Sequence, residues 1–309
     1  MSKTAFLFSG QGAQYIGMGK DLYDTFPICK QTFEEASDSI GMDLVKLIFE
    51  GRKEELDLTE NTQPAIVTMS LAAFRAISMY DIVPDVVAGL SLGEYSALTA
   101  SGYFNLKEVI PLVQKRGKYM QEAVPEGVGK MSAVLGLSED KVREACEEAN
   151  IFGIVEPANF NCPGQIVIGG EIKAVDEAGK LAKEKGAVKV IDLPVSAPFH
   201  TSMLKPAAEK LKVVLNSVEI GQLKYPVISN VTADFIQNQN QVKELLYQQV
   251  MNSVLWEQSI RKMIEFGVTK FIEIGPGRTL SGFVKKIDRR LSVLNVEDTN
   301  SLMNFGKIR

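Results

Sequence analysis

The sequence has little histidine and little cysteine, and both shortages restrict its chemistry. Among 309 residues there are one histidine, His200, and three cysteines. The cysteines are Cys29, Cys146 and Cys162. They are odd in number and far apart, so they match neither a disulfide framework nor a zinc motif. We therefore expect no metal, no cofactor and a reducing compartment. Any reaction that needs an imidazole has to use His200.

Long apolar runs and a strong net charge are also missing. No apolar run approaches the roughly 20 residues that a membrane span needs, and the N-terminus lacks the layout of a signal peptide. The formal net charge of −4 and the pI of about 5.4 argue against a nucleic-acid binder. We expect a cytoplasmic protein, monomeric by default, with neither a nucleic-acid nor a membrane partner.

Apolar strand-like runs alternate with helix-like segments over most of the chain. Thr4 to Phe8 is an apolar run that ends in a glycine-rich loop, and Pro226 to Val231 reads as another strand. Pro64 to Met79 reads as a helix with Thr62 as its N-cap. Such alternation predicts a mostly parallel sheet covered on both faces. We predict a large α/β-hydrolase-like domain formed by residues 1–127 and 198–309.

Residues 128–197 show a different order of expected strands and helices. The expected order there is strand, helix, strand, strand, helix, strand, with a Pro163-Gly164 turn between the two middle strands. This is the order of a ferredoxin-like unit. We predict an inserted ferredoxin-like small domain over residues 128–197.

A candidate nucleophile lies in Gly89-Leu90-Ser91-Leu92-Gly93, which matches G-x-S-x-G. In this motif a sharp strand-to-helix turn exposes the serine hydroxyl at the carboxyl end of a sheet. The helix that follows directs its first N–H groups at the same place, which favours a developing oxyanion. A motif with only three specified residues also occurs by chance. Here, however, an apolar strand precedes the motif and a helical stretch follows it. We predict that Ser91 is a nucleophile.

The candidate base is His200, because a serine needs a base near neutral pH. A lone histidine is more often structural, but His200 lies where the chain returns from the small domain to the large one. Clefts form at such junctions. No acidic residue is picked out as an orienting partner, and a main-chain carbonyl can serve instead.

Six motifs follow one another along nearly the whole chain. They are Phe8-Ser9-Gly10-Gln11-Gly12, Thr62-Gln63-Pro64-Ala65, Gly89-Leu90-Ser91-Leu92-Gly93-Glu94, Gln114-Lys115-Arg116-Gly117, Phe199-His200 and Glu273-Ile274-Gly275-Pro276-Gly277. In this order they resemble the bacterial malonyl-CoA:acyl carrier protein transacylase family, which shares them with polyketide synthase acyltransferase domains. The resemblance implies a ping-pong transfer of malonyl from malonyl-CoA to acyl carrier protein, supplying extender units for fatty-acid synthesis.

The resemblance also implies roles in the reaction itself. Gln11 and Leu92 would form the oxyanion hole. Gln249 matches an active-site glutamine of the family, and the backbone there would orient His200.

Further residues are implied to contact the substrate. Arg116 would hold the malonyl carboxylate, and its planar fork suits bidentate binding of a carboxylate. From the residues alone, a solvated surface arginine between lysines is an equal alternative. Phe199 would limit the pocket to malonyl and disfavour methylmalonyl. Asn161 and Gln165 would lie on the small-domain side of the cleft.

One residue departs from the family pattern. Leu90 stands where many members have a histidine immediately before the serine. Two other functions therefore stay open. The serine motif is shared with esterases and thioesterases, and a non-catalytic binder of carrier proteins could have lost activity, although Ser91 and His200 are both present.

Overall fold

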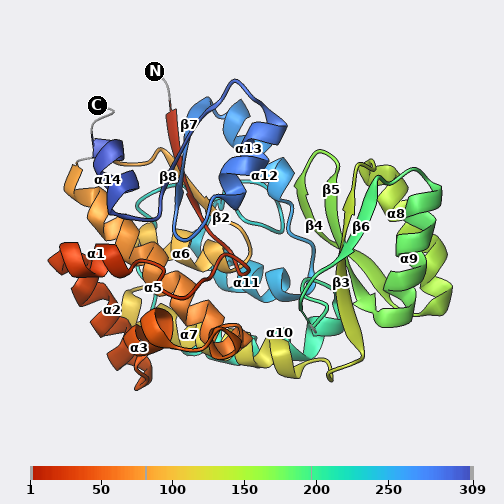
Figure 1. The fold of residues 1–309 in the computed structure, drawn as a ribbon, viewed down its shortest axis with the longest axis horizontal. Helices are drawn as coiled ribbons and strands as arrows, with labels where there is room; N and C mark the ends of the chain where they lie inside the picture. Colours follow the sequence, from red (N-terminus) through yellow and green to blue (C-terminus); the bar gives the residue numbers. More distant parts are fainter. Residues whose placement is uncertain (1–2, 81, 196, 307–309) are drawn as a thin grey trace.

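The computed structural model describes residues 3–80, 82–195 and 197–306. They form two four-stranded sheets with helices around them, one parallel and one antiparallel (Figure 1). Within these ranges no helix is both long enough and apolar enough to cross a membrane.

The parallel sheet has its four strands in the order β2-β1-β7-β8. Their bounds are β1 (Lys3–Phe8), β2 (Val86–Gly89), β7 (Val268–Ile274) and β8 (Ser292–Val296). In the register Phe8 is opposite both Gly89 and Ile274. The carboxyl ends of the three neighbouring strands therefore lie together, which is where open α/β sheets place their ligands.

Helices cover both faces of this sheet. Side chains of β1 alternate between the two cores, since Phe6 and Phe8 join one cluster while Ala5 and Leu7 join the other. The first cluster is formed with α2, α5, α6, α7, α10 and α11, and the second with α12 and α13. The expected α/β architecture with a mostly parallel, covered sheet is therefore confirmed.

The helices around the parallel sheet differ widely in length. They are α1 (Lys20–Thr25), α2 (Pro27–Ile40), α3 (Leu44–Glu50), α4 (Lys53–Leu56), α5 (Thr59–Ile77), α6 (Leu92–Ala100), α7 (Leu106–Glu122), α10 (Lys205–Ser217), α11 (Val242–Met251), α12 (Trp256–Glu265), α13 (Thr279–Ile287) and α14 (Thr299–Gly306). Short 3₁₀ turns are η1 (Ser78–Tyr80), η3 (Ser202–Leu204) and η4 (Gln239–Gln241).

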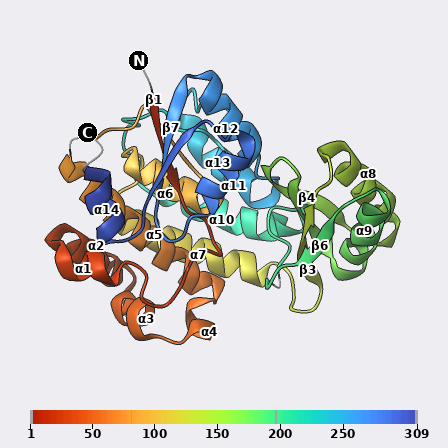
Figure 2. The ribbon, with the colours of Figure 1, turned by 45° about the horizontal axis from the view of Figure 1, so that its top comes forward.

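The antiparallel sheet has its own core. Its strands, in the order β4-β5-β3-β6, are β3 (Gly129–Leu135), β4 (Val155–Cys162), β5 (Gln165–Glu171) and β6 (Lys189–Asp192). Helices α8 (Glu139–Ala149) and α9 (Ile172–Glu184), with the turn η2 (Asn150–Phe152), complete it. Figures 1 and 2 both show α8 and α9 on the side away from the parallel sheet. A third apolar cluster lies between these helices and the strands.

Two local predictions are wrong. The helix predicted from Pro64 begins at Thr59, because a further turn precedes the proline, and Thr62 Oγ1 donates to Leu56 O at 2.5 Å instead of capping. The segment predicted as a strand over residues 226–231 forms only isolated bridges, at Val87–Val227 and Ile228–Phe235. The next side chain, that of Asn230, bonds to the turn at Ser91 instead.

Candidate active site

Ser91 lies in the sharp turn between β2 and α6, at the carboxyl end of the parallel sheet. Its backbone has φ 52° and ψ −104°, which is strained for a residue with a side chain. The turn needs glycine on both sides. A Cβ on Gly89 would lie 2.0 Å from the Gly93 carbonyl, and one on Gly93 would lie 2.1 Å from Phe8 O. The motif therefore packs directly against the end of β1.

Asn230 holds this turn in place, and sequence reasoning missed it. Its Oδ1 accepts from Ser91 N at 2.6 Å, and its Nδ2 donates to Gly89 O at 2.8 Å. Both groups are buried, so each bond replaces a contact with water that folding removes. The signal available in the sequence was the position of Asn230 near the end of an expected strand.

His200 contacts the nucleophile directly. Ser91 Oγ and His200 Nε2 are 2.6 Å apart, and His200 Nδ1 is 2.7 Å from Gln249 O. A carbonyl oxygen can only accept, so Nδ1 carries the proton and donates to it. Nε2 is then the bare nitrogen and accepts from the Ser91 hydroxyl. This is the tautomer that a general base for Ser91 requires.

The imidazole is held neutral. Burial, followed by the nearby positive charge of Arg116, lowers the pKa of His200 from 6.5 to about 3. His200 also has a positive φ of 62°, which is uncommon for a residue other than glycine. Near neutral pH the ring is therefore uncharged and able to accept a proton.

Arg116 is a buried cation beside the nucleophile. Its side chain comes from α7 and is only 1% exposed, so the alternative of a solvated surface arginine is wrong. Nη1 donates to Gln63 Oε1 at 2.9 Å, while Nη2 donates to Gln249 Oε1 at 2.9 Å and to Ser91 Oγ at 3.2 Å. Among the described residues it forms no direct ion pair with a carboxylate, and its Nε has no hydrogen-bond partner. Buried charges usually have a partner of opposite sign, so this guanidinium is suited to an anionic group of a ligand.

Gln11 and Leu92, expected as the oxyanion hole, lie on the two sides of the Ser91 turn. Leu92 is the first residue of α6, where helix N–H groups lack intrahelical partners. Gln11 follows Gly10, whose added Cβ would lie 2.5 Å from Leu90 O. The glycine-rich loop after β1 therefore packs against the turn. The Gln11 side chain accepts from Gln63 Nε2 at 3.3 Å, which connects the loop to the partner of Arg116.

The other expected contact residues are less tightly connected to Ser91. Phe199 is 8% exposed and packs in the core next to His200. Asn161 is buried near the end of β4. Gln165 accepts from Lys286 Nζ at 3.0 Å, so its described contact is with α13. Substrate contacts of these three residues stay predictions.

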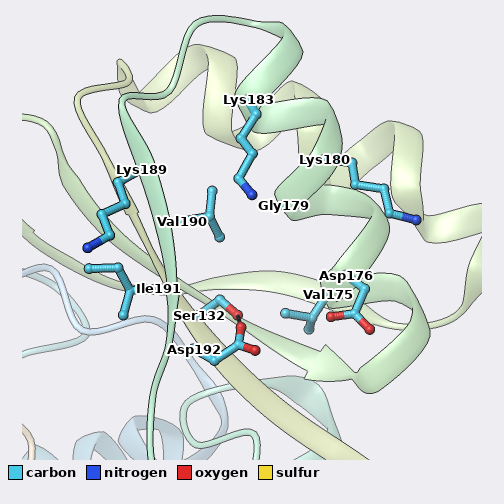
Figure 3. Close-up of a pocket in the computed structure, with 10 residues that line it drawn as sticks. All are labelled: Ser132, Val175, Asp176, Gly179, Lys180, Lys183, Lys189, Val190, Ile191 and Asp192. Carbon is cyan, nitrogen blue, oxygen red and sulfur yellow. Dashed lines mark hydrogen bonds between the residues drawn. The ribbon is translucent and has the colours of Figure 1, made fainter.

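A separate hollow lies between α9 and β6 on the antiparallel sheet (Figure 3). Two of its acidic side chains, Asp176 and Asp192, accept from Lys130 Nζ at 2.8 Å each, and Ser132 Oγ also donates to Asp192. Its lining contains neither Ser91 nor His200. The hollow is therefore distinct from the site around Ser91.

Known proteins resemble this chain over nearly its full length. A family model described as an acyl transferase domain matches residues 5–302. A malonyl CoA-acyl carrier protein transacylase of Bacillus subtilis (strain 168) is 50% identical, over 98% of this chain and 96% of its own length. The transacylase of Escherichia coli (strain K12) is 41% identical, over 98% of both chains.

Solved structures agree. A malonyl CoA-acyl carrier protein transacylase of Clostridium perfringens superposes with a TM-score of 0.96 at 50% identity, over 98% of this chain and 96% of that one. A malonyl-transacylase in complex with its type II PKS acyl-carrier protein gives 0.97 at 44% identity, over 100% of both chains. The chain therefore belongs to the acyl transferase domain family, as the order of its six motifs predicted.

Proposed function

We propose that this protein transfers the malonyl group from malonyl-CoA to the phosphopantetheine thiol of acyl carrier protein through an acyl-enzyme on Ser91. One observation carries the proposal. Ser91 Oγ lies 2.6 Å from a neutral imidazole nitrogen of His200 and 3.2 Å from the buried guanidinium of Arg116. A nucleophile, a base and a carboxylate-binding group thus meet at one oxygen. The names of the relatives support the same donor and acceptor.

The first half of the reaction forms the acyl-enzyme. Ser91 Oγ attacks the thioester carbonyl carbon while its proton passes to His200 Nε2. The N–H groups of Gln11 and Leu92 stabilise the negative charge on the carbonyl oxygen. Collapse breaks the carbon–sulfur bond, and the imidazolium returns the proton to the coenzyme A thiolate. The backbone carbonyl of Gln249 keeps the ring in the required tautomer throughout.

The second half repeats these steps with the carrier protein. His200 takes the proton of the phosphopantetheine thiol, whose sulfur attacks the Ser91 ester. Collapse breaks the bond to Oγ, which regains the proton. The oxygen of the malonyl carboxylate stays on Arg116 during both halves, because this group is unchanged by the reaction.

Residues around the acyl chain would set specificity. Arg116 selects an acyl group with a free carboxylate, since a buried guanidinium gains most from a partner of opposite charge. Phe199 limits the room next to His200 and disfavours a branched malonyl group. Asn161 and Gln165 contact the substrate from the small-domain side.

The proposal extends to the domains and the setting of the protein. We assign residues 1–127 and 198–309 to an α/β-hydrolase-like catalytic domain and residues 128–197 to a ferredoxin-like small domain. The order β4-β5-β3-β6 and the separate apolar cluster support the latter. Residues 1–2, 81, 196 and 307–309 lie outside the described residues. The proposal also holds that the protein is monomeric and cytoplasmic and serves fatty-acid synthesis. Light scattering after size-exclusion chromatography tests whether it is a monomer.

Transfer to the carrier protein is the decisive test. The protein is mixed with malonyl-CoA and holo acyl carrier protein, and malonyl-carrier protein is measured by intact mass. Apo carrier protein, which lacks the thiol, is the matched control. Malonylation of the holo form alone is the expected result. Release of free malonate at one rate with either form would point to a hydrolase, and no turnover of malonyl-CoA would point to a non-catalytic binder.

A further inference from the structure

A buried carboxylate lies behind the nucleophile and has no role in the steps above. Glu94 is in the first turn of α6, three residues after Ser91, and is 1% exposed. Its Oε2 accepts from Gln249 Nε2 at 2.6 Å and from Asn230 N at 3.2 Å. A buried carboxylate is costly unless its surroundings satisfy it, so its retention here calls for an explanation.

Both partners of Glu94 hold the reacting groups. Asn230 binds the Ser91 turn through two side-chain bonds. Gln249 binds His200 Nδ1 through its backbone carbonyl and Arg116 through Oε1. The Glu94 backbone N–H donates to Ser91 O at 3.1 Å, but the carboxylate bonds to neither Ser91 Oγ nor His200. It acts on them through Asn230 and Gln249.

The carboxylate is one of three groups, with Ser91 O and Arg116, that set which way the Gln249 amide faces. An ionised carboxylate only accepts hydrogen bonds, so it must meet the NH₂ end of the amide. That end also donates to Ser91 O at 3.0 Å, which leaves Oε1 for Arg116 Nη2. A flipped amide would place Oε1 against two acceptors and its NH₂ against the guanidinium. Three contacts would then be unfavourable at once.

We propose that ionised Glu94 is a positioning residue, which fixes the Gln249 amide and the Asn230 backbone and thereby aligns His200, Arg116 and Ser91 for acyl transfer. The inference rests on the proposed function. Glu94 also supplies the negative charge that balances Arg116, because Gln249 connects the two by hydrogen bonds. A neutral Glu94 would weaken its hydrogen bonds from Gln249 and from Asn230, since hydrogen bonds to an ionised acceptor are roughly twice as strong as neutral ones.

The charge of Glu94 is sensitive to pH near neutrality. Burial raises the pKa of Glu94 from 4.5 to about 7, against the opposing effects of its hydrogen bonds from Gln249 and Asn230 and the charge of Arg116. The titratable and charged groups nearest to it are Arg116 of α7, Tyr95 of its own helix and, through Gln249, His200. Glu94 gains a proton as pH falls through about 7, whereas His200 stays neutral to about pH 3. A loss of rate near pH 7 therefore belongs to Glu94.

The test compares wild type with Glu94→Gln, which keeps the shape and removes the charge. The rate of Ser91 acylation by malonyl-CoA is measured by rapid quench and intact mass between pH 5 and 9. For wild type we expect up to about a tenfold loss per pH unit below pH 7. For Glu94→Gln we expect a rate roughly 10- to 100-fold lower at pH 8, with no such loss between pH 8 and pH 5.

Glu273→Gln is the matched control. Glu273 is also a buried carboxylate at 1% exposure, but it accepts from the N–H groups of Leu280 and Ser281 at the start of α13. We expect this variant to keep the wild-type pH profile. Glu94→Gln with the wild-type rate overturns the proposal, and so does a slow Glu94→Gln that keeps the wild-type loss below pH 7.

A second reagent separates this inference from the proposed function. The same pH series is run with a fluorophosphonate, which labels an activated serine whatever its natural substrate. If malonyl-CoA gives no acyl-enzyme, the proposed function fails while the labelling still reports on Glu94. Should Glu94→Gln fail to fold, the wild-type profile decides alone, and a labelling rate that is flat through pH 7 overturns the proposal.

Discussion

Replacing Arg116 by alanine should abolish the preference for an acyl group with a free carboxylate. Arg116 has five N–H donors, and three bonds to protein atoms are formed, to Gln63, Gln249 and Ser91. The unpartnered Nε and an N–H on Nη1 are left, but these two lie on different edges of the guanidinium. A bidentate carboxylate therefore binds Nε together with Nη2, whose bond to Ser91 it displaces. Two bonds to a carboxylate are therefore available.

The size of the effect follows from those two bonds. Each hydrogen bond to a charged group contributes about 1.5–3 kcal/mol, so their loss lowers kcat/KM for malonyl-CoA by roughly 10²- to 10⁴-fold. Acetyl-CoA has no carboxylate and should lose far less. Part of its loss comes from the carbonyl oxygens of Gln63 and Gln249, which are left without their donor.

The assay measures kcat/KM for malonyl-CoA and acetyl-CoA with wild type and Arg116→Ala. Lys118→Ala is the control on the same helix, because the Lys118 side chain is 56% exposed and its one ion pair within the described ranges is with Glu122 at 3.9 Å. We expect that control to leave the ratio of the two substrates unchanged. An equal loss on both substrates in Arg116→Ala would refute the assignment of Arg116 to the malonyl carboxylate.

Three further predictions follow from packing and burial. Gly93→Ala should lower the melting temperature by at least several degrees and abolish acylation, because the new Cβ would lie 2.1 Å from a backbone oxygen. Gly282→Ala should do neither, because no described atom lies within 4 Å of its new Cβ. Equal melting temperatures for the two variants would contradict the account. Phe199→Ala should raise turnover of methylmalonyl-CoA relative to malonyl-CoA, and an unchanged ratio in competition assays would exclude Phe199 as the limit. The thiols of Cys29, Cys146 and Cys162 should resist a disulfide reagent at pH 7.5 until the protein is denatured. Burial raises the pKa of each thiol, to about 12 for Cys29 and Cys146. Fast labelling of the native protein would contradict this prediction.

The parts of the site that depend on local sequence could be predicted. The turn at Ser91 follows from a buried strand, two glycines and a helix within one short segment. His200 was identified by elimination, since no other histidine exists. The layered fold followed from the alternation of strands and helices, which reports burial on both faces of a sheet.

The polar network behind the turn could not be predicted in the same way. Asn230 and Ser91 are 139 residues apart in sequence, and Gln249 and Ser91 are 158 apart. Their contacts depend on how four separate elements pack, and no local pattern encodes that. The failed strand over residues 226–231 shows the same limit, because Asn230 bonds to the turn instead of extending the sheet.

Burial of the charged residues was equally hidden from the sequence. Arg116 sits between two lysines in an amphipathic helix and reads equally well as a surface residue. Glu94 follows the serine motif directly, yet an acidic residue in the first turn of a helix is ordinary. Only the packing of α7 and α11 against α6 shows that both charges are enclosed.

The central claim is that Ser91 carries the acyl group, and intact mass of the protein after brief mixing with malonyl-CoA tests it most directly. Wild type and Ser91→Ala are compared, and peptide mapping locates the adduct. We predict a malonyl adduct on Ser91 in wild type and none in the variant. An adduct of equal yield on Ser91→Ala, or one located on another residue, would contradict the account.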